Sequence, residues 1–107
     1  MSAFQPVDEQ NFDAEVLQSS LPVLLEFGAP WCGPCKRIEP LLEQLGQKWA
    51  GRVRLAHVNV DECAGLVASY GVMSVPTVIL FAGGQEKVRL NGLQPLENLI
   101  AKFEPHL

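Results

Sequence analysis

Residues 27–36 read F-G-A-P-W-C-G-P-C-K and place Cys32 and Cys35 on either side of a glycine and a proline. The run before them, P-V-L-L-E-F at residues 22–27, is short and almost continuously apolar, which is typical of a strand covered on both faces. After the cysteines, apolar residues recur at the three- and four-residue spacing of a helix. These are Ile38, Leu41, Leu42, Leu45 and Trp49. The stretch therefore predicts a buried strand, a loop that carries the cysteines, and a helix.

A second strand follows this helix. Residues 53–60, V-R-L-A-H-V-N-V, alternate between apolar and polar positions. Strand, helix and strand over this length form a parallel crossover unit, which is expected to be right-handed. Pro40 lies within the helical pattern and lacks an N–H, so we expect a kink there rather than an end. Cys32 then lies just past the carboxyl end of a central strand, where open α/β sheets place their chemistry.

Shorter elements surround this unit. Asn11 is expected to cap a short helix, and another short helix is expected near residues 63–70. Residues 77–81 and 87–90 are joined by a Gly-Gly turn and predict an antiparallel hairpin. The short helix after Asn11 is expected to have an apolar face made of Phe12, Val16 and Leu17.

The chain closes with one more helical pattern, for which Pro95 suits the first turn. Its apolar face consists of Leu96, Leu99, Ile100 and Phe103. Together the elements predict an α/β fold in which helices cover both sides of a mixed sheet. With 107 residues and no internal repeat or linker, the chain is expected to form one domain over positions 1–107.

The amino-acid composition argues against several classes of function. A net charge of −4 argues against nucleic acid or an anionic membrane as the main partner. We find no secretory signal pattern and no apolar run long enough to span a bilayer. Three cysteines are too few for a disulfide scaffold and favour a cytoplasmic protein whose thiols are normally reduced.

Cys32 and Cys35 allow three kinds of site. A disulfide across so short a loop restricts the unfolded chain by only about 2 kcal/mol, so a structural staple is a poor interpretation. A zinc or iron–sulfur site would need two more ligands, and only Cys63 and His57 are candidates. The third possibility is a redox couple, which needs a thiolate and a second thiol beside it.

The local sequence favours the redox couple. A free thiol is only about 3% ionised at pH 7. The helix that follows Cys32 presents unpaired N–H groups and a positive dipole end, both of which favour the thiolate. Cys35, one turn later, is suited to resolve a mixed disulfide. Gly33 and Pro34 add no charge, so we expect the couple to lie on the reducing side.

Four segments together resemble the thioredoxin family over nearly the whole chain. They are W-C-G-P-C-K at residues 31–36, V-N-V-D-E at 58–62, V-P-T at 75–77 and F-A-G-G at 81–84. The resemblance implies a four- or five-stranded mixed sheet flanked by four helices. It also implies a general protein-disulfide reductase in which Cys32 attacks and Cys35 resolves. Disulfide-containing client proteins and a thioredoxin reductase are the implied partners, with no bound cofactor or metal and a monomeric state.

Glu26 is the main secondary candidate. A carboxylate within an apolar strand is desolvated, which raises its pKa. The resemblance implies that an acid at this position accepts the proton of Cys35, and the family usually has aspartate there. His57 stands where the family usually has lysine, and it can pair with Glu26 or relay its proton. The alternative is that Glu26 turns to solvent and His57 is an ordinary strand residue.

The resemblance also implies a cis peptide bond before Pro76 and a client-binding rim around Cys32. An extended client segment would pair with the backbone of Val75, as an added strand does. The predicted rim consists of Trp31, Gly33, Pro34, Ser74, Val75, Pro76, Gly92 and Leu93.

Several residues depart from the family pattern. Gly28 stands where an aromatic residue is usual, Pro30 directly precedes the tryptophan, and Ser74 replaces a glycine or alanine. With Glu26 and His57, these changes leave room for a specialised oxidoreductase that serves one client. From a different class, the chain could be a metal-holding or clamp-like binding module. Cys63 is expected to be a packing residue, with a regulatory or dimerising thiol as the alternative.

Overall fold

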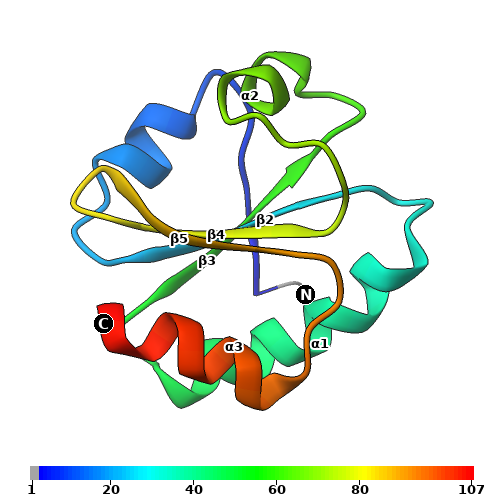
Figure 1. Cartoon of the computed structure of the whole chain (residues 1–107). Helices are drawn as coiled ribbons and strands as arrows, with labels where there is room; N and C mark the ends of the chain where they lie inside the picture. The colour runs from blue at the N-terminus through cyan, green and yellow to red at the C-terminus, as the bar shows by residue number, and fades with distance from the viewer. Residues whose placement is uncertain (1–2) are drawn as a thin grey trace.

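One mixed β-sheet organises the computed structural model, which describes residues 3–107 (Figure 1). The sheet has five strands in the order β1-β3-β2-β4-β5, which confirms the predicted mixed sheet. β1 and β2 are both parallel to β3, whereas β4 is antiparallel to β2 and to β5. The strands are β1 (Gln5–Pro6), β2 (Val23–Gly28), β3 (Arg54–Asn59), β4 (Thr77–Ala82) and β5 (Gln85–Asn91).

Helices cover both faces of this sheet, as predicted. In Figure 1, η1 (blue) and α2 lie on one side of the sheet, and α1 and α3 lie on the other. A single 3-10 turn, η2, extends the last helix. No helix within residues 3–107 has both the length and the apolar character needed to cross a bilayer. The helical segments are η1 (Asp13–Leu17), α1 (Gly33–Lys48), α2 (Ala64–Ser69), α3 (Leu96–Phe103) and η2 (Glu104–His106).

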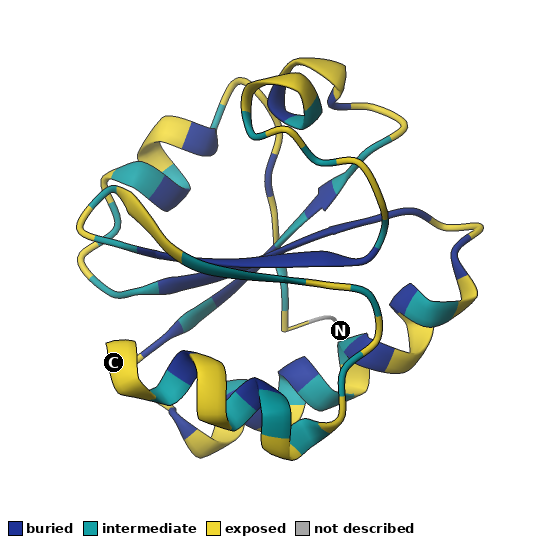
Figure 2. Ribbon diagram, in the orientation of Figure 1, coloured by how far each residue is buried: buried dark blue, intermediate teal, exposed yellow. Residues whose placement is uncertain are grey.

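β2 is the central strand, and all six of its residues are buried (Figure 2). Side chains alternate between the two faces of a strand. Leu25 therefore packs with η1 and α2, and Leu24 packs with α1 and α3. Glu26 shares the face of Leu24, so its side chain points towards α1, and a Cβ added at Gly28 would lie on the same face. The apolar pattern of β2 thus placed an acidic side chain in the interior.

Helix α1 begins directly after Cys32, which occupies the N-cap position with extended backbone. Pro34 lies in the first turn, where its missing N–H leaves no hydrogen bond unmade. Pro40 lies inside α1 and does not end it, as predicted, since the helix continues to Lys48. The kink expected at Pro40 stays a prediction. This arrangement fixes the cysteine pair at the carboxyl end of the central strand.

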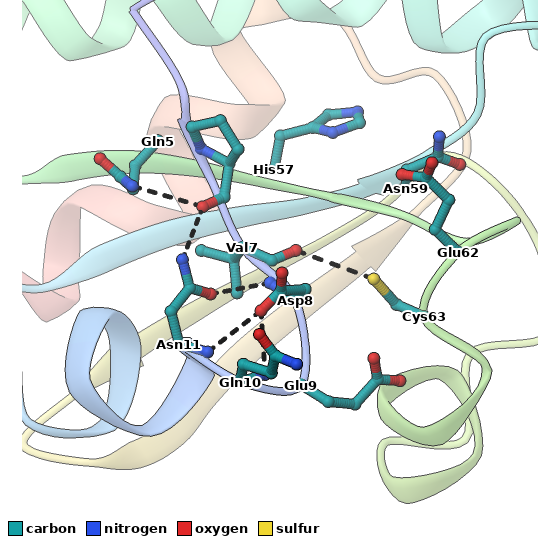
Figure 3. Close-up of a pocket in the computed structure, with 11 residues that line it drawn as sticks. Gln5, Val7, Asp8, Glu9, Gln10, Asn11, His57, Asn59, Glu62 and Cys63 are labelled. Atoms are coloured by element: carbon teal, nitrogen blue, oxygen red, sulfur yellow. Dashed lines mark hydrogen bonds between the residues drawn. The ribbon is translucent and has the colours of Figure 1, made fainter.

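Two details near the N-terminus differ from the predictions. Asn11 does not cap η1, which begins at Asp13 without a side-chain cap. Its amide instead holds the preceding loop, accepting from the N–H of Asp8 at 2.8 Å and donating to the carbonyl of Pro6 at 3.1 Å (Figure 3). The two-residue strand β1 was not predicted, because so short a strand containing proline has no sequence pattern. Near the other end, Pro95 caps α3 rather than standing in its first turn.

The loop that Asn11 holds borders an open hollow of about 690 Å³ between β1, β3 and residues 62–63 (Figure 3). Cys63 lines this hollow, is 2% exposed, and its Sγ donates to the carbonyl of Val7 at 3.8 Å. Burial raises the pKa of the Cys63 thiol, with Glu9 and other nearby carboxylates adding to the effect. Cys63 is therefore the packing residue that the sequence predicted.

Candidate functional site

The cysteine pair forms a disulfide at the N-terminus of α1. Cys35 is fully buried and Cys32 is 4% exposed, so Cys32 is the more accessible of the two. The Sγ of Cys32 accepts a hydrogen bond from the backbone N–H of Cys35 at 3.1 Å. A negative charge on that sulfur would be stabilised by this donor and by the positive end of the sixteen-residue helix.

A cis peptide bond joins Val75 and Pro76, as expected. Strand β4 begins at Thr77, so the backbone of Val75 is outside the sheet ladder. The N–H of Gly92 donates to the carbonyl of Pro76 at 2.8 Å, which brings the segment after β5 next to the cis proline. Gly92 has φ +80, a conformation that favours glycine.

The surface near the cysteines is apolar and unusually exposed. Trp31 is 68% exposed and Leu93 is 43% exposed. Trp31 also lines a shallow hollow of about 250 Å³. Its other lining residues are Val60, Val67, Val72, Met73, Ser74 and Val75. The structure therefore brings Trp31, Ser74 and Val75 together.

Two residues of this surface were missed by sequence reasoning. Met73 is 96% exposed, and nothing in its local pattern singled it out. The indole N–H of Trp31 donates to Asp61 at 2.9 Å, which fixes the ring against the loop after β3. Because Trp31 and Asp61 are thirty positions apart in the sequence, the contact between them can be seen only in the folded structure.

Glu26 is fully buried, as its position in the apolar strand predicted. Neither of its carboxyl oxygens has a hydrogen-bond partner within residues 3–107. Burial raises the pKa of Glu26 from its ordinary value of 4.5 to about 9, and the nearby carboxyl of Glu39 adds to the rise. The Glu26 side chain is therefore protonated at neutral pH in this disulfide-bonded state.

His57 is on β3 and lies directly opposite Glu26 of β2 in the strand pairing. The Nε2 atom of His57 is 3.8 Å from Oε1 of Glu26 and 3.6 Å from Oε2 of Glu39. Burial lowers the pKa of His57, although the Glu39 carboxylate acts in the opposite direction. The imidazole thus stands between a buried carboxyl and a half-buried one.

Gly28 is what makes room for this arrangement. A Cβ at position 28 would lie 2.7 Å from Oε2 of Glu26 and 3.0 Å from Nε2 of His57. Glutamate is one methylene longer than aspartate, so its carboxyl reaches the space in front of residue 28. Three of the departures from the family pattern, Glu26, Gly28 and His57, therefore form one structural unit.

Glu39 belongs to the same unit and was not predicted. It lies four residues after Cys35 on α1, so both side chains are on the same side of that helix. This spacing was a usable signal, because a charged residue at that place borders the buried face. The spacing does not, however, tell which residues of the strands Glu39 contacts.

A cation could also be held in this cluster, by ligand atoms of Glu26, Glu39 and His57. One ligand atom from each lies within 4.8 Å of the others, and residues 3–107 hold no second group of this kind. The zinc site considered from the sequence is not assembled, because Cys63 packs in a different buried cluster from Cys32 and Cys35. Lys36 lines a hollow beside Glu39 and His57, where its ammonium would oppose a bound cation. We therefore interpret the three residues as an acid–base cluster.

Comparisons with known proteins agree with this geometry. Residues 3–104 match the family model described as Thioredoxin. The chain is 39% identical to Thioredoxin 1 of Nostoc sp. and 38% identical to Thioredoxin of Synechocystis sp., in each case over all 107 residues and the full length of both proteins. It is 42% identical over 101 residues to Thioredoxin M4, chloroplastic, of Arabidopsis thaliana, covering 94% of this chain and 52% of that protein.

Proposed function

Because the chain belongs to the thioredoxin family and is a protein-disulfide reductase, we propose that Cys32 is its attacking thiolate and Cys35 its resolving thiol. The observation that carries this assignment is the position of Cys32 as the N-cap of α1, with the N–H of Cys35 directed at its sulfur. Cys35 is the more buried of the two and is shielded from external disulfides.

Client reduction then proceeds in two exchanges. The Cys32 thiolate attacks a client disulfide, forms an S–S bond to one client sulfur and expels the other as a thiolate. Cys35 loses its proton and attacks Sγ of Cys32, which releases the second client sulfur and forms the Cys32–Cys35 disulfide. Two electrons pass from the protein to the client, and the two client sulfurs leave as thiols once protonated.

Glu26 is the proposed acceptor of the Cys35 proton, either directly or through a water molecule. The protonated Glu26 of the oxidised state holds the proton that Cys35 regains when its disulfide is reduced. A buried carboxyl with a pKa near 9 is a stronger base than an exposed one and suits exchange with a thiol. His57 is the proposed relay for this proton.

Clients are proposed to dock along the cis proline and the exposed apolar surface. An extended client segment would pair with the backbone of Val75, and the ring of Trp31 would cover the adjoining side. Ser74, Pro76, Gly92 and Leu93 complete the proposed contact surface. Gly33, Pro34 and His57 are proposed to tune the potential of the couple.

The family implies disulfide-containing clients and a thioredoxin reductase as partners. We further propose a monomer in the cytoplasm, a compartment in which the couple can be kept reduced. The free, buried Cys63 is in keeping with a reducing compartment.

A reductase-coupled insulin-reduction assay tests the two cysteine roles. The wild type should be active, and Cys32→Ser should be inactive because no thiolate remains to attack. Cys35→Ser should accumulate the mixed disulfide with the client, which mass spectrometry detects under non-reducing conditions. Activity retained in Cys32→Ser, or a mixed disulfide formed through Cys63, would contradict the assignment.

One observation favours a second candidate, a reductase specialised for one client. The Glu26–Gly28–His57 unit lies beside the active-site loop and departs from the usual residues. Clients trapped on Cys35→Ser discriminate the two possibilities, since a general reductase should capture many proteins and a specialised one a single dominant protein.

A further inference from the structure

Three side chains from three elements connect the buried acid to the surface. Glu26 of β2 is completely buried, whereas the side chains of His57 on β3 and Glu39 on α1 are 28% and 30% exposed. The Nε2 atom of His57 lies within 4 Å of a carboxyl oxygen on each side, at 3.8 Å from Glu26 and 3.6 Å from Glu39. A movement of less than about 1 Å at either contact gives hydrogen-bonding distance.

Within residues 3–107, the hollows beside this row of groups are lined by its outer members, His57 and Glu39. A hollow of about 190 Å³ beside the active-site loop is lined by Lys36, Glu39 and His57, together with Ala29, Pro30 and Asn59. A second hollow of about 270 Å³ is lined by Phe4, Pro6, Glu39 and His57. Glu26 lines neither hollow, so a proton on its carboxyl has to pass a neighbouring side chain to leave.

We propose that His57 and Glu39 form the proton outlet of Glu26, with Glu39 as a positioning residue that was not among the sequence predictions. This inference rests on the proposed exchange of a proton between Glu26 and Cys35, and it adds the route by which that proton leaves. Glu39 acts through His57 and through its own charge beside Glu26, and it does not touch the reacting sulfurs.

The transfer is balanced in protons. Neutral His57, protonated at Nδ1, accepts the proton of Glu26 at Nε2 and becomes a transient imidazolium. The same Nε2–H is then delivered to the carboxylate of Glu39, which restores the neutral ring and leaves Glu26 ionised. Glu39 finally releases the proton to solvent in the adjoining hollow.

The charges around the imidazole determine how readily it can carry the proton. The titratable side chains that face His57 are Glu26 from β2, Glu39 from α1 and, across the hollow, Lys36 from the same helix. In the 270 Å³ hollow the neighbours are Phe4 and Pro6, which carry no charge, whereas Asp8, Glu9 and Glu62 line the 690 Å³ hollow that His57 also borders. The negative charge of Glu39 opposes the lowering of the His57 pKa by burial, so it stabilises the imidazolium while the proton is in transit, and it also raises the pKa of Glu26.

The test uses Glu39→Gln and His57→Gln in the full-length protein. The measured quantity is the rate at which the mixed disulfide is released, from pH 6 to pH 9.5, at low and at high buffer concentration. Glu39→Gln should move the midpoint of the profile down by about one pH unit, because a like charge near Glu26 has been removed. His57→Gln should slow release by about tenfold at low buffer and recover with added imidazole, which replaces the missing relay.

Two controls separate the outlet from a structural role. Glu43→Gln removes a half-buried carboxylate one helical turn further along α1 and should behave as wild type. Glu39→Asp keeps the carboxylate and should restore most of the wild-type profile.

The inference is overturned if Glu39→Gln leaves the midpoint unchanged, or if the slow release of His57→Gln is insensitive to imidazole. Glu26→Gln distinguishes this failure from a failure of the proposed function. If Glu26→Gln abolishes the pH dependence and Glu39→Gln does not shift it, only the outlet is wrong. An unchanged profile in Glu26→Gln would refute the proton-acceptor role itself.

Discussion

The pH dependence of folding stability offers the sharpest test of the buried acid. Glu26 ionises near its ordinary value of 4.5 when the chain is unfolded and at about 9 when it is folded and oxidised. Between these values the folded protein binds one proton more than the unfolded protein does. The contribution of Glu26 to the free energy of unfolding therefore falls as pH rises through this window, and the loss is complete above about pH 9.

Its magnitude follows from the width of the window. Each pH unit costs about 1.4 kcal/mol, so the Glu26 contribution between pH 5 and pH 7.5 is about 3 kcal/mol. A domain of this kind has a total stability of about 5–15 kcal/mol, so the effect is large enough to measure. Glu26→Gln keeps the shape of the protonated side chain and cannot ionise. The stability of the variant relative to wild type should therefore increase by about 3 kcal/mol over this range.

Urea denaturation of the oxidised protein at pH 5, 6, 7 and 7.5 measures this difference. Glu43→Gln controls for the loss of a carboxylate elsewhere on the same side of the molecule. Parallel stability curves for wild type and Glu26→Gln would refute the reasoning, because they would mean that Glu26 binds its proton equally in the folded and unfolded states.

Three further predictions follow from other contacts. Gly28→Ala should destabilise the protein by about 1–3 kcal/mol in urea denaturation, because its Cβ would lie 2.7 Å from a Glu26 oxygen. The same change should cost less in a Glu26→Asp background, and an equal cost in both backgrounds would argue against the steric explanation. Asp61→Asn should lower kcat/KM for insulin by about two- to fivefold without changing the potential, since it weakens the bond that fixes Trp31. Pro34→His should raise the reduction potential by about 30–60 mV in a glutathione titration, because a positive charge near the pair stabilises its thiolate.

The candidate site could be located from the sequence because its signals are local. A strand pattern, a cysteine pair and a helix pattern follow one another, and their order alone puts Cys32 at a helix N-terminus beyond a strand end. The burial of Glu26 was predictable for the same reason, since every neighbour in its strand is apolar. The two-residue strand β1 was not predictable, because its pairing with β3 depends on the finished sheet.

Only the tertiary structure decided what surrounds the buried acid. The sequence presented Glu26, Gly28 and His57 as separate departures, and Glu39 drew no attention. Strand alternation and helix periodicity determine which face a side chain occupies, but they do not determine which residue of another element it meets. That depends on how β2 and β3 are registered and where α1 lies across them. The packing of three elements turned three isolated substitutions and an overlooked glutamate into one acid–base cluster next to the cysteines.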